Sequence, residues 1–174
     1  MKEYYHMATD TLLDIYVDEL GSLHAAECQL LKVLPRLAKV ATSPQLACAF
    51  LEHTDETQEH IDRLDQIFAM LGLRSNGTTC EPMEALIEDS KEVVVRYCNP
   101  HVMDVALIAA VQQIDHYEMA RYGCMRTYAR LLGYEEAADL LQETLDEVAE
   151  ADRKLTQLAE IVINVKAVSQ MTFA

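Results

Sequence analysis

Four glutamates stand at matching positions in two halves of the sequence, where they could bind metal ions together. A shift of 91 residues without gaps places Glu27 on Glu118 and Glu56 on Glu147. The same shift brings further residues into register: Glu52 with Glu143, Glu59 with Glu150, Arg63 with Lys154, Ala38 with Ala129, and Leu64 with Leu155. Carboxylates are ligands that suit iron and manganese. The repeat predicts two related segments, each of which contributes half of a carboxylate site.

Apolar residues around these glutamates recur every three or four positions, which is the spacing of one buried helix face. Around Glu27 this stripe consists of Tyr16, Leu20, Leu23, Leu30, Leu34, Leu37 and Ala41. Three further stripes run through residues 46–71, 108–132 and 137–162. Ionisable groups interrupt each near its middle: His53, Glu56 and His60 in the second stripe, Asp115 and Glu118 in the third, and Glu147 in the fourth. The candidate ligands are therefore predicted to face the core.

Turn and capping residues divide the chain into long helices at about residues 8–41, 44–71, 101–132 and 135–165. Pro35 lies within the first helix, and we expect it to kink the helix without ending it, because the apolar spacing continues in phase. Ser43 and Pro44 can cap and open the second helix. A shorter helix fits residues 82–97.

These elements predict an all-α protein of one domain over residues 1–174, folded as a ferritin-like four-helix bundle. Tight turns join the long helices into two hairpins, at about residues 8–71 and 101–166. The stretch between them, about 72–100, is too long for a turn between neighbours and contains the short helix. It suits a crossover that lets the second and third long helices run parallel.

The hairpin geometry brings the four glutamates to one level of the bundle. Glu27 lies about 16 residues before the first turn and Glu56 about 13 residues after it. Glu118 and Glu147 have the same relation to the second turn. At a rise of about 1.5 Å per residue, the partners lie within about 5 Å of one level. We therefore expect all four carboxylates to converge near the centre.

Several carboxylates in an apolar core repel one another and lose their hydration, which is costly for each uncompensated charge. Protonation can neutralise some of them, and buried Lys or Arg can neutralise others. The basic candidates near the stripes are Arg63, Arg121 and Lys154, and we expect these to be too few or too peripheral for the whole cluster. Divalent cations held by carboxylates and imidazoles are the favoured solution. Structural ion pairs are the alternative.

Composition argues against several classes of function. The net charge of −15, without a basic stripe, would repel a nucleic-acid backbone. Apolar runs fall short of the ~20 residues that span a membrane, and the first residues lack the pattern of a signal peptide. The five cysteines are scattered without metal-binding spacing. We expect a cytoplasmic protein that binds neither nucleic acid nor membrane.

Several ordered motifs also resemble the bacterial YciE/YciF-like family, which is ferritin-like and related to rubrerythrin. The resemblance extends over about residues 10–165. The motifs are Ala25-Ala26-Glu27-Cys28-Gln29-Leu30, His53-Thr54-Asp55-Glu56-Thr57, Ala106-Leu107-Ile108-Ala109-Ala110, His116-Tyr117-Glu118 with Tyr122-Gly123, and Glu143-Thr144-Leu145 with Glu147 and Asp152. The resemblance implies a homodimer, a di-iron site and a link to stress responses.

By the same resemblance, seven residues are implied as metal ligands: Glu27, His53, Glu56, Asp115, Glu118, Glu143 and Glu147. Asp115 stands where the family usually has Glu, and its side chain is one methylene shorter. Spacing permits His60, Glu59 or Glu150 to replace one of the seven. The implied cofactor is two iron ions, with manganese as the alternative.

The leading hypothesis is a di-iron protein that reacts with oxygen or peroxide, or oxidises Fe²⁺, in a stress response. The chain has no rubredoxin-like module with four cysteine ligands, so a peroxidase would need an external electron donor. Catalase-like dismutation of peroxide at two manganese ions is a second hypothesis. The rival is a non-catalytic stress protein whose acidic bundle binds a protein partner, with metal absent or structural. The sequence identifies no catalytic residue.

Two segments suggest that the protein forms a homodimer. Residues 8–20 extend the first helix beyond the level needed to cover its partner, and the short helix at 82–97 carries spare apolar residues. These residues are Leu86, Ile87, Val93 and Val94. The alternative is that both segments cap one end of the bundle.

Overall fold

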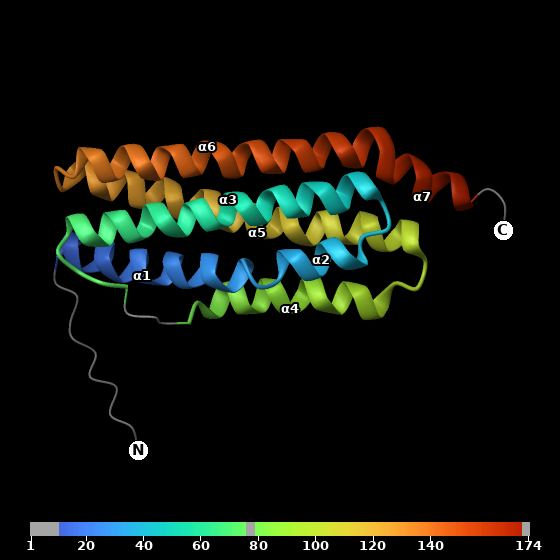
Figure 1. Cartoon of the computed structure of the whole chain (residues 1–174), viewed down its shortest axis with the longest axis horizontal. Coiled ribbons are helices and arrows are strands. Elements are labelled where there is room, and N and C mark those ends of the chain that lie inside the picture. The colour runs from blue at the N-terminus through green and yellow to red at the C-terminus, as the bar shows by residue number, and fades with distance from the viewer. Residues whose placement is uncertain (1–10, 76–78, 172–174) are drawn as a thin grey trace, which may run out of the picture.

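The computed structural model describes residues 11–75 and 79–171, which form helices with no strand among them. The helices are α1 (Leu12–Leu30), α2 (Leu34–Val40), α3 (Pro44–Met70), α4 (Glu81–Arg96), α5 (Pro100–Leu131), α6 (Glu135–Leu158) and α7 (Asn164–Met171), with a π-helical turn, η1 (Ala159–Ile163), before α7. Four rods lie side by side, formed by α1 with α2, by α3, by α5 and by α6 (Figure 1). The predicted all-α bundle is confirmed. No helix within the described ranges is long and apolar enough to cross a membrane.

The crossover between the two hairpins consists mainly of α4. α3 and α5 run in the same direction, and α4 returns along the outside of the bundle between them (Figure 1). It packs against α1 and α5. Ile87 and Val93 are buried in the core, and Leu86 and Val94 pack partly against it. These four apolar residues therefore cover the bundle of their own chain.

The first rod is interrupted, where the sequence predicted a kinked but continuous helix. α1 ends at Leu30 and α2 begins at Leu34, with Pro35 in the first turn of α2. The intervening Val33 N–H bonds to the Leu30 carbonyl at 2.9 Å, three residues back instead of four. Proline has no N–H to donate, and its ring crowds the carbonyl four residues earlier. The apolar phase continues across the break, since Leu30, Leu34 and Leu37 are all buried.

The outer ends of the rods also differ from the expected boundaries. The predicted start at residue 8 lies outside the described residues, and α1 begins at Leu12 behind a capping box. In this box the Thr11 hydroxyl accepts from the Asp14 N–H at 3.2 Å, and the Asp14 carboxylate accepts from the Thr11 N–H at 3.2 Å. The fourth rod consists of α6, η1 and α7, and it extends past its predicted end at 165 to Met171.

Two apolar clusters fill the bundle on either side of a polar layer. One cluster includes Leu30, Leu34, Leu46, Phe50, Leu107, Val111 and Leu155. The other includes Tyr16, Leu20, Leu64, Ile67, Tyr122 and Leu141. Between them along the rods lie buried polar residues, which we call the polar layer: Glu27, His53, Thr57, His60, Asp115, Glu118 and Thr144. The residues of the polar layer thus share one level of the bundle, away from both ends.

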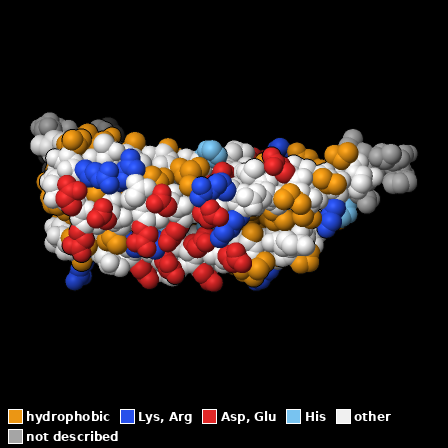
Figure 2. Space-filling model, turned by 90° about the horizontal axis from the view of Figure 1, so that it is seen from above, with side chains coloured by type: hydrophobic (Ala, Val, Ile, Leu, Met, Phe, Trp, Pro, Cys, Tyr) orange, Lys and Arg blue, Asp and Glu red, His pale blue; other side chains and the backbone are white. Residues whose placement is uncertain are grey.

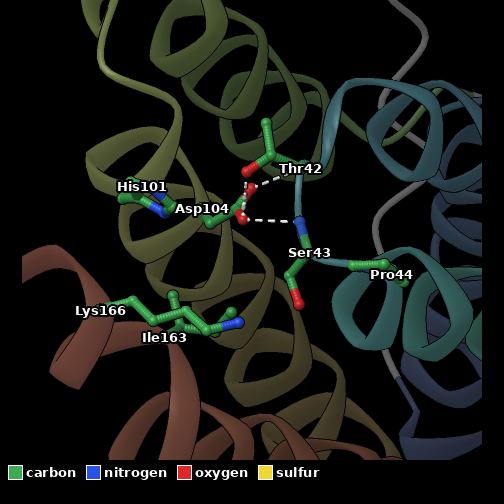
Figure 3. A pocket seen from close by; sticks show the side chains of 7 residues that line it. All are labelled: Thr42, Ser43, Pro44, His101, Asp104, Ile163 and Lys166. Carbon is green, nitrogen blue, oxygen red and sulfur yellow. Dashed lines mark hydrogen bonds between the residues drawn. The ribbon is translucent and has the colours of Figure 1, made fainter.

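Asp104 ties the link between α2 and α3 to α5 (Figure 3). This buried carboxylate accepts hydrogen bonds from the Thr42 N–H at 2.8 Å, the Thr42 hydroxyl at 2.6 Å and the Ser43 N–H at 2.9 Å. Ser43 occupies the expected capping position of α3, but its hydroxyl bonds to the Gln45 side chain at 3.0 Å and makes no cap. Asp104 therefore holds the two residues that lie at the start of α3, while the Ser43 hydroxyl provides no side-chain cap for the first N–H groups of this helix.

We expect Asp104→Asn to lower the free energy of unfolding by about 1–3 kcal/mol, because the amide nitrogen replaces one of the two carboxylate oxygens and turns a donor toward one of the two N–H groups. Urea unfolding of the purified protein measures this change. Asp89→Asn, at an exposed position of α4, is the matched control. Equal stability of the two variants would show that Asp104 does not hold this end of the bundle together.

Candidate metal centre

Three buried side chains meet in the polar layer, and we call them the triad: His53 from α3, and Asp115 and Glu118 from α5. Each offers a ligand atom, and these atoms all lie within 4.8 Å of one another. Asp115 and Glu118 share a helix face because they are three residues apart. One imidazole nitrogen with carboxylate oxygens is a donor set that suits iron or manganese. The triad could therefore hold a metal ion.

The polar atoms of the triad have no partners of their own. Both ring nitrogens of His53 and all four carboxylate oxygens of Asp115 and Glu118 are buried without a hydrogen bond from any described residue. His53 Nδ1 lies 3.9 Å from an Asp115 oxygen, which is too far for a hydrogen bond. A buried polar group without a partner costs about 1–3 kcal/mol, and native proteins contain few of them. So many in one place make the triad a candidate binding site.

Burial shifts the pKa values of the triad toward the neutral forms. It raises the pKa of Asp115 and that of Glu118 well above their ordinary values, and neighbouring carboxylates add to both shifts. Burial, followed by the charge of His60, lowers the pKa of His53 to about 4. His53 is therefore neutral at pH 7, which is the form that binds metal. A cation in the layer would favour the ionised carboxylates.

Glu27 reaches the same layer from α1 and is fully buried. Its Oε1 accepts a hydrogen bond of 2.5 Å from the Tyr122 hydroxyl and lies 3.4 Å from His60 Nδ1. Its Oε2 is unpartnered among residues 11–75 and 79–171. The Glu27 charge contributes to the raised pKa values of Asp115 and Glu118, so it is close to the triad. Glu27 thus offers one free oxygen to a metal in this layer.

Glu56 lies at the edge of the polar layer and is 28% exposed. Its carboxylate contacts the Lys154 ammonium of α6 at 3.5 Å. Burial raises the pKa of Glu56 above its ordinary value, while Lys154 acts in the opposite direction. Glu56 is thus held by one long contact at the edge of the polar layer.

Glu143 and Glu147, two further predicted ligands, are held by Arg63 of α3. The guanidinium contacts both oxygens of Glu147, at 2.5 and 2.8 Å, and one oxygen of Glu143 at 3.2 Å. Arg63 is only 12% exposed. Arg63 therefore compensates these two carboxylates, whereas the expectation that basic residues would be too few or too peripheral concerned the whole cluster. Of the three basic candidates, Arg121 pairs with Glu19, which is not one of the predicted ligands.

The two basic contacts are equivalent under the repeat in the sequence. The shift of 91 residues that places Arg63 on Lys154 also places Glu56 on Glu147. Arg63 reaches from the first hairpin to Glu147 of the second, and Lys154 reaches from the second to Glu56 of the first. The repeat extends to contacts between helices, but the Arg63 contact is bidentate and the Lys154 contact is single.

His60, expected as a replacement ligand, bridges two carboxylates instead. Its Nδ1 lies 3.4 Å from Glu27 and its Nε2 lies 3.1 Å from Glu147. Burial alone would lower the pKa of His60, but the charge of Glu27 and the hydrogen bond to Glu147 raise it to about 9. A protonated His60 therefore serves as a buried cation. The two other replacement candidates lie outside the layer: exposed Glu59 and Glu150 contact Arg63 and Arg153.

Two features of the site were not predicted from the sequence. The Tyr122 hydroxyl orients Glu27, although Tyr122 stands at a position that any packing aromatic could occupy. Its place four residues after Glu118, on the same helix face, is the signal that could have found it. The repeat also holds an asymmetry that could have been noticed, since Thr144 stands where the first half has His53. The second half therefore lacks an imidazole at that position.

Comparisons with known proteins place these features in a family context. The chain matches the family described as "Domain of unknown function (DUF892)" over residues 11–168. It is 41% identical to protein YciF of Escherichia coli strain K12 over 162 residues, 92% of this chain and 98% of that protein.

Solved structures give the same result. The crystal structure of the E. coli stress protein YciF matches with a TM-score of 0.86 at 40% identity, covering 89% of this chain and 98% of that one. YcfI from Rhodopseudomonas palustris matches with a TM-score of 0.85 at 33% identity, covering 88% and 98%. A protein from Xanthomonas campestris pv. campestris shares the fold, with a TM-score of 0.75 at 16% identity over 92% and 99%.

The bridging role of His60 predicts how stability without metal depends on pH. The pKa of His60 in the folded protein, about 9, lies above its ordinary value of 6.5. The stabilisation of the folded state by protonated His60 is therefore complete below pH 6.5 and is lost as the pH rises toward 9. This loss is on the order of 2–3 kcal/mol. We expect His60→Gln to flatten the fall in unfolding free energy between pH 6.5 and 9, measured with chelator present. His116→Gln, at an exposed position, is the control. Identical pH profiles for wild type and His60→Gln would contradict a charged His60.

Proposed function

We propose that this chain, which belongs to the DUF892 family, holds metal ions in its polar layer and uses them to react with oxygen, peroxide or Fe²⁺ during stress. The observation that carries the proposal is the cluster of unpartnered ligand atoms on His53, Asp115 and Glu118, taken over the described part of the chain. The similar E. coli protein YciF is described as a stress protein. Similarity over nearly the whole chain supports the same setting here.

The residues present fit iron, with manganese as the alternative. A first ion would be held by the triad, with Glu27 and Glu56 as carboxylates within the same layer. A neutral imidazole and several carboxylate oxygens match the preferences of these metals. We propose two ions, and Glu143 and Glu147 would join the ligand set only when Arg63 releases them. The charged His60 stands between Glu27 and Glu147 and balances their charge in the meantime.

Bound iron would supply a redox-active centre for oxygen or peroxide. The protein itself contributes orientation and exclusion of water. Tyr122 fixes one oxygen of Glu27 and leaves the other free, and the burial of His53 keeps its ring unprotonated. The two apolar clusters seal the polar layer from both ends. An external electron donor and a homodimer are part of the proposal, and light scattering tests the dimer.

Metal analysis followed by an oxidant titration tests this function. Protein purified without a tag should contain iron or manganese, or should bind Fe²⁺ under anaerobic conditions. Glu118→Gln should lower the bound metal at least about tenfold, because it removes a ligand that is fully buried. Glu150→Gln, which alters an exposed carboxylate outside the layer, should keep the wild-type metal content. The iron-loaded wild type should then consume oxygen or peroxide faster than the Glu118→Gln variant.

Two results would contradict the proposal in different ways. If the wild-type protein binds neither iron nor manganese, the proposed metal site is refuted. Wild type that binds metal but leaves oxygen and peroxide unconsumed would favour the rival, a non-catalytic stress protein with a structural ion.

A further inference from the structure

A small pocket opens beside His53 on the seam between α3 and α6. Its lining includes Ala49, Glu52, His53 and Glu56 from α3, and Lys154 from α6. His53 is 3% exposed, and neither of its ring nitrogens has a partner among the described residues. A buried, unpartnered ligand of the triad therefore forms part of the wall of a pocket at the surface.

The surroundings of this pocket are acidic. Exposed carboxylates lie along both helices of the seam, with Glu52 and Glu59 on α3 and Glu143 and Glu150 on α6. The face of the bundle that carries α6 shows many acidic side chains with a few basic ones between them (Figure 2). Clustered charge of one sign raises the local concentration of counter-ions. This face would collect divalent cations and repel anions.

Lys154 is the basic side chain in the lining of the pocket. Its ammonium is 45% exposed and makes one contact of 3.5 Å with Glu56. The repeat relates this contact to the one between Arg63 and Glu147. There Arg63 is 12% exposed and contacts both oxygens of Glu147. A half-exposed single contact contributes little to stability, whereas a bidentate guanidinium pair is stronger. Glu56 is therefore the easier of the two equivalent glutamates to free.

We infer that a divalent cation reaches the triad through this pocket, and that Glu56 exchanges Lys154 for the arriving ion. The inference rests on the proposed function, since it names the route to that same metal site. Glu52 and Glu56 attract the ion at the surface, Lys154 swings into solvent as Glu56 turns, and His53 is the first ligand of the triad to be met. The Arg63 side of the repeat stays closed during this step.

Rapid mixing of the metal-free protein with Co²⁺ tests the route, because the visible absorption of bound Co²⁺ reports arrival at the site without requiring any activity. Lys154→Gln should speed the binding phase by about twofold to fivefold, since the ion no longer competes with the ammonium. Ala49→Leu should slow this phase by filling the pocket, while the final amount of bound Co²⁺ stays the same.

Arg153→Gln is the matched control for charge. It removes one positive charge from the neighbouring position, where Arg153 is 63% exposed and pairs with Glu150 outside the pocket lining. Equal acceleration by Arg153→Gln and Lys154→Gln would overturn the exchange at Glu56, because a general change in surface charge would then explain both. An unchanged rate in Ala49→Leu would overturn the route. Absence of Co²⁺ binding in the wild type would instead refute the metal site on which the route depends.

Discussion

The cost of burying ionisable groups among apolar side chains governs this bundle. Two apolar clusters stabilise the fold, and both stop at the level where Glu27, His53, Asp115 and Glu118 point inward. Extending the clusters through this level with Leu and Ala would remove the unpartnered atoms and the raised carboxyl pKa values. A chain that keeps these groups gives up stability, and a bound cation is the simplest compensation for that loss.

The repeat shows two ways to compensate acidic groups within one chain. Around Glu147 the protein uses its own cations, because Arg63 and the protonated His60 contact the carboxylate together. Around the triad no basic residue of the described chain makes a contact of this kind, and the acids stay unpartnered. The presence of His53 opposite Thr144 is the corresponding difference in sequence. The triad thus combines the imidazole of the first half with two carboxylates of the second half.

The sequence predicted the arrangement of the rods well because a stripe of apolar residues specifies which helix face is buried. The same stripes placed Glu27, His53, Asp115 and Glu118 in the core, and a long segment before α5 required the crossover. The reach of Arg63 to Glu147 could not be read from spacing, since a long flexible side chain at the edge of a stripe can turn inward or outward. The break before Pro35 could not be predicted from spacing alone. The apolar residues keep their helical spacing across it, while the proline removes a backbone hydrogen bond.

Thermal unfolding of the wild type and of Asp115→Asn/Glu118→Gln, each with chelator and with Fe²⁺ under anaerobic conditions, tests the central claim most directly. Both acids have pKa values in the folded protein that lie above their ordinary values. Each therefore lowers the stability of the metal-free fold as the pH rises above its ordinary pKa. At pH 8 the double variant should therefore melt higher than the wild type with chelator present, and Fe²⁺ should raise the melting temperature of the wild type alone. A double variant that melts lower with chelator, together with a wild type that does not respond to Fe²⁺, would contradict the account.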